Sequence, residues 1–132
     1  MLSTIGPATP DHTIYTKRLP CFARVDDPRD PTTVTPAIKA SVERFVADYT
    51  GYFNSYNTGG AVVSDAFPRV ITVAGLGMFT TGKDRRTAGI VSDIYHHTIS
   101  VLGAATPPKR ARPFARCAMA SSALLIRSIV ER

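Results

Sequence analysis

Residues 67–105 read FPRVITVAGLGMFTTGKDRRTAGIVSDIYHHTISVLGAA. Residues 70–74 form a short, mostly β-branched run bounded by proline and glycine, which predicts a buried strand. Residues 80–84 then predict a turn. From Ala88 to Leu102 the apolar residues recur at steps of three and four, which predicts an amphipathic helix ending near Gly103. The stretch therefore predicts a strand, a glycine turn and a helix, which is the basic unit of an α/β layer.

The residues before this stretch predict a second long helix and short extended segments. The helix is expected from Pro36 to about Tyr56, with Thr35 as its N-cap and Pro36 at its first position. Residues 11–18 read as a short extended segment, and residues 22–25 could continue a strand. Together these patterns predict a small, partial α/β domain with a few short strands and two long helices.

Two long blocks of the chain resemble one known family. PRVITVAGLGMFTTGKD, followed by DIYHHTISV, is similar to a segment of the bifunctional rhamnulose-phosphate aldolase/short-chain dehydrogenase family. IGPATPDHTIYTKRLP, at residues 5–20, resembles another block of the same connecting region. The resemblance covers residues 3–105. It implies a region that lies between a class II aldolase part and a short-chain dehydrogenase part.

The domain organisation expected from this resemblance has two parts. Residues 1–105 would be the connecting domain, a class II aldolase-like fragment. Residues 106–132 form a divergent basic tail, in which residues 118–130 could form a third, C-terminal helix. A frameshift in a GC-rich gene is the favoured origin of this tail, and ordinary sequence divergence is the alternative.

The composition limits the classes of function. The chain has 132 residues, 44% of them hydrophobic, and a formal net charge of +6. Residues 106–132 carry a net +5 of that charge, so a basic nucleic-acid surface over the whole protein is not indicated. Neither a signal peptide nor a membrane span is evident, so we expect a cytoplasmic protein that binds neither nucleic acid nor membrane. Cys21 and Cys117 fit no metal-binding spacing and are expected to be free thiols.

The catalytic patterns of the resembled family are not found in this sequence. A class II aldolase holds a divalent metal, commonly zinc, through several histidines, whereas this chain has His12, His96 and His97 and no His-x-His pair. The dinucleotide fingerprint and the Tyr-x-x-x-Lys pair are also absent. We therefore predict no catalytic residue, no metal ligand and no bound cofactor in this chain. The resemblance implies a divalent metal and NAD for the parent protein.

Three residues remain as candidates for substrate binding. His12, Lys17 and Arg18 could line an anionic site for a sugar phosphate, because guanidinium and ammonium groups bind oxyanions. The alternative is a turn histidine beside a solvated basic pair. Gly82 and Lys83 are interpreted as a structural turn, with Asp84 or Thr81 capping the helix that follows.

Two functions follow from these observations. The first is a fragment of a bifunctional aldolase/dehydrogenase of deoxysugar catabolism, of the rhamnose type, inactive without its flanking domains. The second is a non-catalytic interaction or scaffold module whose helices expose apolar residues. This second function predicts that Phe45, Phe53 and Tyr95 are exposed and that the chain self-associates.

Overall fold

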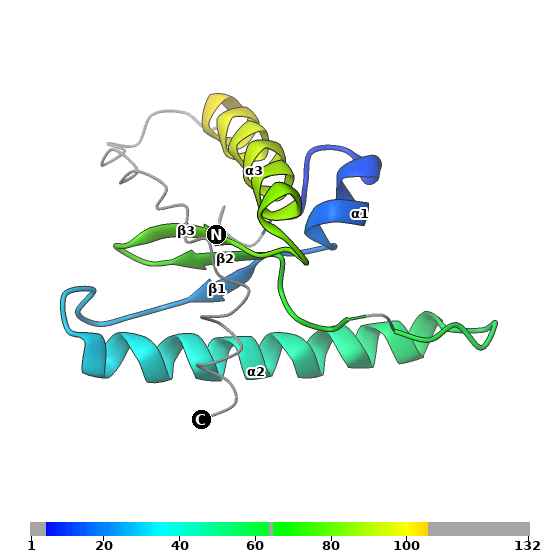
Figure 1. Cartoon of the computed structure of the whole chain (residues 1–132), viewed down its shortest axis with the longest axis horizontal. Helices are drawn as coiled ribbons and strands as arrows, with labels where there is room; N and C mark the ends of the chain where they lie inside the picture. The colour runs from blue at the N-terminus through cyan, green and yellow to red at the C-terminus, as the bar shows by residue number, and fades with distance from the viewer. Residues whose placement is uncertain (1–4, 64, 106–132) are drawn as a thin grey trace.

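The computed structural model describes residues 5–63 and 65–105 of the chain. Helices surround a three-stranded sheet, which confirms the predicted small α/β domain (Figure 1). In chain order the elements are η2 Pro10–His12, α1 Thr13–Thr16, β1 Cys21–Ala23, α2 Pro31–Tyr56, β2 Val70–Val73, β3 Gly77–Thr80 and α3 Arg85–Ala105. The further helix considered for residues 118–130 lies outside the described residues.

The central strand of the sheet is β2. It pairs with β1 in parallel, with Ile71 opposite Cys21, and with β3 in antiparallel fashion, with Ile71 opposite Phe79. All four residues of β2 are buried. A strand covered on both faces reads as a continuous apolar run rather than an alternation, and for this reason the run at residues 70–73 was recognisable in the sequence.

The two long helices cover opposite faces of this sheet, as Figure 1 shows. On the α2 face the buried core consists of Cys21, Ala23, Val25, Val42, Ile71 and Val73. On the α3 face it consists of Val70, Met78, Val91 and Tyr95. Each helix therefore buries its apolar face against one side of a three-stranded sheet, and the strands contribute side chains to both clusters.

A further strand, which the sequence did not predict, lies between β2 and the turn predicted at residues 80–84. The chain reverses at Gly75, whose φ of +81° lies in the region that glycine adopts without strain, and returns as β3. Along β3 the burial alternates, with Met78 packed on the α3 side and Phe79 on the α2 side. The expected direct passage from strand to helix is therefore wrong. The glycines of this segment form a hairpin, and the pairing with β2 makes the short run Gly77–Thr80 a strand.

The long helix α2 begins earlier than the sequence predicts. Its N-cap is Asp30, whose carboxylate accepts a hydrogen bond of 2.9 Å from the backbone N–H of Thr32. Pro31 occupies the first helical position, so Thr35 is not the cap and Pro36 lies inside the helix. Two Pro-containing starts compete in this sequence, and the Asp cap with Pro31 directly after it precedes the other. The predicted end at Tyr56 is confirmed.

The segment expected to be extended at residues 11–18 is instead helical as far as Thr16. Pro10 opens the turn η2, and the hydroxyl of Thr13 donates a hydrogen bond to the Pro10 carbonyl. The Thr16 hydroxyl donates likewise to the His12 carbonyl at 3.0 Å. These side-chain bonds to nearby backbone stabilise a single helical turn, whereas the sequence alternation had suggested a strand.

The helix that follows β3 agrees with prediction at its start. The carboxylate of Asp84 accepts a hydrogen bond of 2.7 Å from the backbone N–H of Thr87, so Asp84 caps α3. Thr81 has another role, because its hydroxyl donates to the Pro68 carbonyl at 2.7 Å.

The aromatic residues expected at an exposed helix surface are not exposed. Tyr95 is 2% exposed because it lies in the core between α3 and the sheet, and Phe45 and Phe53 are half-buried. The side chains that do protrude are Ile14, Tyr56 and Val62, with 81%, 73% and 88% exposed. Among the helices of the described residues, none is both long enough and apolar enough to cross a bilayer.

Candidate functional site

His12 lies at the end of η2 and faces α3. Its ring meets the ring of His97 edge to face, with 6.4 Å between centroids. The Nδ1 atom of His12 is enclosed and has no hydrogen-bond partner. This histidine therefore belongs to the contact between the N-terminal helical turns and α3.

Lys17 follows α1 in an unusual backbone conformation, with a φ of +62°. Its side chain turns inward, so that 9% of the residue is exposed. The ammonium group donates a hydrogen bond to the backbone carbonyl of Asp65 and lies 4.2 Å from the centre of the Tyr49 ring. Lys17 thus links the N-terminal turns to α2 and to the segment before β2, and these contacts compensate for the backbone strain.

Burial lowers the pKa of Lys17 from its ordinary 10.5 to about 8. Desolvation is the main cause, because an ammonium group in a site poor in water loses its hydration. The Asp65 carboxylate raises this pKa and Arg69 lowers it, and these two residues form an ion pair of 2.7 Å with each other. The charged form of Lys17 is therefore held at a cost in the folded chain.

This cost predicts a dependence of stability on pH. Below pH 8 Lys17 is protonated in both the folded and the unfolded chain. Between pH 8 and 10.5 the unfolded chain binds more protons, so the contribution of Lys17 to folding stability rises with pH. The expected rise is on the order of 1–2 kcal/mol, because water at the edge of the site screens part of the effect. Urea unfolding of the wild type and of Lys17→Met measures it.

The comparison of wild type with Lys17→Met separates the effect of Lys17 on stability from the opposite effects of two other groups. Burial raises the pKa of Cys21 from 9.0 to about 11 and that of Tyr95 from 10.0 to about 12, so both lower stability above pH 9. Those losses occur in both proteins and cancel in the difference. The stability difference between wild type and Lys17→Met should rise from pH 8 to 10, while Lys83→Met, at an exposed lysine, should show no such trend. A constant difference for Lys17→Met would contradict the prediction.

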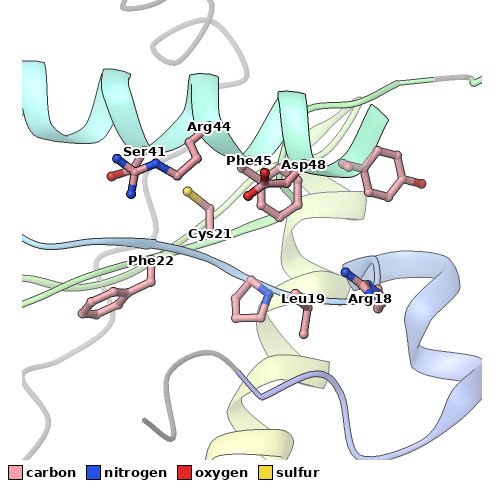
Figure 2. A pocket seen from close by; sticks show the side chains of 10 residues that line it. Arg18, Leu19, Cys21, Phe22, Ser41, Arg44, Phe45 and Asp48 are labelled. Carbon is pink, nitrogen blue, oxygen red and sulfur yellow. The ribbon is translucent and has the colours of Figure 1, made fainter. Parts of the chain in front are cut away.

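Arg18 points to a cavity between α2 and the chain that leads into β1 (Figure 2). Its guanidinium lies 4.2 Å from the centre of the Tyr52 ring. The cavity has a volume of about 400 Å³. Its lining consists of residues 18–22 on one side and Ser41, Arg44, Phe45, Asp48 and Tyr49 of α2 on the other. The positions on α2 follow one another at helical spacing, so one face of the helix forms a wall of the cavity.

The structure does not gather the three predicted site residues around one ligand position. His12 contacts His97 on α3, whereas Lys17 and Arg18 contact tyrosines of α2. Of the three, Arg18 is the one that lines the cavity. The binding of a sugar phosphate by these residues remains a prediction.

Sequence reasoning missed the residues that α2 contributes to the cavity. Arg44 and Asp48 lie on the polar side of a predicted helix, where charged residues are ordinarily solvated. Their spacing of four shows only that they share a helix face. Nothing in the sequence indicates that residues 18–22 lie opposite that face, because this proximity arises from the packing of α2 against β1.

The thiol of Cys21 is free, as predicted. It is also buried, and this burial raises its pKa to about 11. A thiol with so high a pKa is a poor nucleophile at neutral pH. Cys117 lies outside the described residues. Over residues 5–63 and 65–105, no group of three or more His, Cys, Asp or Glu side chains is placed so as to hold a metal ion.

Comparison with known proteins gives two matches. A family model described as "Aldolase class II, second domain" matches residues 1–115. The chain is also similar to a protein of Bacillus subtilis (strain 168) named "Uncharacterized oxidoreductase YuxG", with 35% identity over 106 residues. The aligned region is 80% of this chain and 15% of the Bacillus protein, so the chain spans a small part of that relative's length. No solved structure matches the chain.

Proposed function

Because the chain belongs to the family described as aldolase class II, second domain, we propose that it is a connecting domain of a longer bifunctional protein. One flanking part would be a metal-dependent aldolase and the other an NAD-dependent short-chain dehydrogenase. In this proposal the connecting domain has no catalytic residue of its own. It acts in the cytoplasm by holding the two catalytic parts together.

The observation that carries this proposal is the extent of the match to the Bacillus protein. One stretch of 106 residues, most of this chain, corresponds to 15% of a protein whose name describes an oxidoreductase. The described residues of this chain form a sheet with a helix on each face and a core on both sides. A unit that folds around its own core fits the role of a separate domain between two others.

The reaction proposed for the parent protein follows from the sequence resemblance to the rhamnulose-phosphate enzymes. The aldolase part would cleave a ketose phosphate such as rhamnulose 1-phosphate to dihydroxyacetone phosphate and lactaldehyde. The dehydrogenase part would then oxidise an aldehyde or alcohol product with NAD. A zinc aldolase binds its metal through several ligands. In the described part of this chain His12 lies beside His97, but no third His, Cys, Asp or Glu side chain joins them in a possible metal site. We therefore assign metal and NAD binding to the flanking parts.

A scaffold function is the second candidate, and the protruding apolar residues favour it. Ile14, Tyr56 and Val62 are each more than two-thirds exposed, and a flanking domain or a second copy could cover such apolar side chains. A chain that remains a monomer at high concentration in analytical ultracentrifugation would contradict self-association.

A chimaera tests the proposed connecting role. The matching segment of the Bacillus relative is replaced by residues 5–105 of this chain, and two activities are measured: cleavage of rhamnulose 1-phosphate and NAD reduction with lactaldehyde. We expect the chimaera to keep both activities within a few-fold of the intact relative. The isolated chain, assayed with zinc and with NAD, should show neither.

Two outcomes would overturn the proposal. The first is metal-dependent cleavage of the sugar phosphate by the isolated chain, which would show that the domain itself is catalytic. The second is the absence of both activities from the intact Bacillus relative, which would remove the proposed substrates. A chimaera with the same segment in scrambled order is the control, since it tests whether any linker of that length suffices.

A further inference from the structure

The cavity beside Arg18 is a groove at the open edge of the sheet. The strand order is β1-β2-β3, so β1 pairs with another strand on one side only. Residues 18–22, which lead into and form the start of β1, make one wall of the groove, and α2 makes the other. A volume of about 400 Å³ is within the range of pockets that hold small molecules.

Two guanidinium groups lie at opposite ends of this groove. Figure 2 shows Arg44 at the end near Ser41 and Arg18 at the end near Leu19. In the part of the chain that the structure describes, neither guanidinium forms an ion pair, since the salt bridge found there joins Arg69 to Asp65. Each cation therefore keeps hydrogen-bond donors available for an oxyanion, which a guanidinium can bind through two parallel bonds.

Between the two arginines the groove offers an acceptor and an apolar floor. The Asp48 carboxylate lies between the ends of the groove, as Figure 2 shows, and no described residue forms a salt bridge with it. Cys21 and Phe45 lie close to it in the lining, and the Phe45 ring stacks on Tyr49 with 6.1 Å between centroids. A carboxylate repels an anion but accepts hydrogen bonds from hydroxyl groups. The middle of the groove is thus suited to a neutral, hydroxylated body.

We propose that this groove binds a small polyhydroxylated molecule with an anionic group at each end, of the class of sugar bisphosphates or phosphorylated sugar acids. Arg18 binds one terminal oxyanion and Arg44 binds the other. Asp48 accepts hydrogen bonds from hydroxyls between them. This ligand site goes beyond the connecting role and does not rest on it, because the role concerns the flanking parts and the groove lies within this chain.

Calorimetric titration of the full chain tests the proposal, with fructose 1,6-bisphosphate as the probe. We expect saturable binding of one molecule per chain. Fructose 6-phosphate should bind roughly tenfold or more weakly, because it leaves one guanidinium without an oxyanion. Hexane-1,6-diol bisphosphate has both anionic ends but no hydroxyls between them, so it should also bind more weakly than the sugar bisphosphate.

Single substitutions locate the binding. Arg18→Gln and Arg44→Gln should each weaken the bisphosphate roughly tenfold, to about the affinity of the monophosphate. Arg85→Gln is the matched control, since Arg85 is exposed at the start of α3 and does not line the groove. Asp48→Ala removes both a hydroxyl acceptor and a negative charge, so it should lower the affinity for the sugar bisphosphate relative to the affinity for the hexanediol bisphosphate. Circular dichroism confirms that each variant is folded.

Several results would overturn the proposal. Equal affinity for the bisphosphate and the monophosphate would show that only one end is bound. Equal loss with Arg85→Gln would assign the effect to general charge, and unchanged affinity in Arg44→Gln would place the ligand elsewhere. A hexaglutamate peptide that displaces the bisphosphate and binds more tightly would assign the groove to an acidic protein segment. None of these results would affect the activities expected of the chimaera, so the two proposals fail separately.

Discussion

Replacing Ile71 with alanine is expected to lower the free energy of unfolding by about 3–4 kcal/mol. Ile71 is 2% exposed at the centre of β2, where it is paired with Cys21 of β1 and Phe79 of β3. The truncation removes buried apolar surface and leaves a cavity between the sheet and α2, since close-packed neighbours relax only in part. A loss of this size is a large fraction of the stability of a small domain.

Urea unfolding followed by circular dichroism measures this loss. The midpoint should fall while the slope of the unfolding free energy against denaturant stays constant, because the same surface is exposed on unfolding. Ile14→Ala is the matched control: it deletes the same atoms from a side chain that is 81% exposed, and it should change stability by less than about 0.5 kcal/mol. Equal effects from the two substitutions would show that the packing described for β2 is incorrect.

Replacing Gly82 with alanine is expected to destabilise the domain by about 1–3 kcal/mol. A Cβ atom at this position would lie 2.6 Å from the backbone nitrogen of Ala88 and 2.9 Å from Cβ of Thr87. Both atoms belong to the first turn of α3, so a backbone shift is needed to relieve the contact. Gly82 is therefore required because β3 turns directly against the start of the helix.

The same substitution at Gly89 provides the control. Gly89 lies within α3, and a Cβ atom there would meet nothing within 4 Å. Alanine is the better helix former by about 1 kcal/mol, so Gly89→Ala should leave stability unchanged or raise it. Thermal unfolding of both variants gives the comparison. If Gly89→Ala were destabilising and Gly82→Ala neutral, the close packing described at Gly82 and the open space described at Gly89 would both be incorrect.

Local sequence patterns predicted two kinds of element: helices with a regular apolar stripe, and a strand that is buried on both faces. The α3 helix shows its apolar stripe in the order of its residues, and the Asp84 cap lies one residue before it. The β2 strand was recognisable because its burial on both faces leaves a continuous β-branched run. The start of α2 was misplaced, because two Pro-containing starts lie within six residues and periodicity alone does not choose between Pro31 and Pro36.

The candidate site was predicted only in part. Arg18 was identified as a residue suited to an anion, and it lines the groove. Its counterpart Arg44 was not identified, since helix periodicity places it on the polar face. The inward turn of Lys17 was also not foreseen, because it depends on a positive φ and on the Asp65 carbonyl, 48 residues along the chain.

The amino-acid sequence by itself indicated a relation to class II aldolases through two long blocks of residues. It also determined the two long helices and the central strand, because these depend on periodicities read over a few turns. The tertiary structure alone decided that Gly77–Thr80 is a strand, that β1 lies parallel to β2, and that Arg18 and Arg44 share one groove. Strands of three or four residues have little stability of their own. Their pairing partners, distant in the chain, therefore fix both the sheet and the groove at its edge.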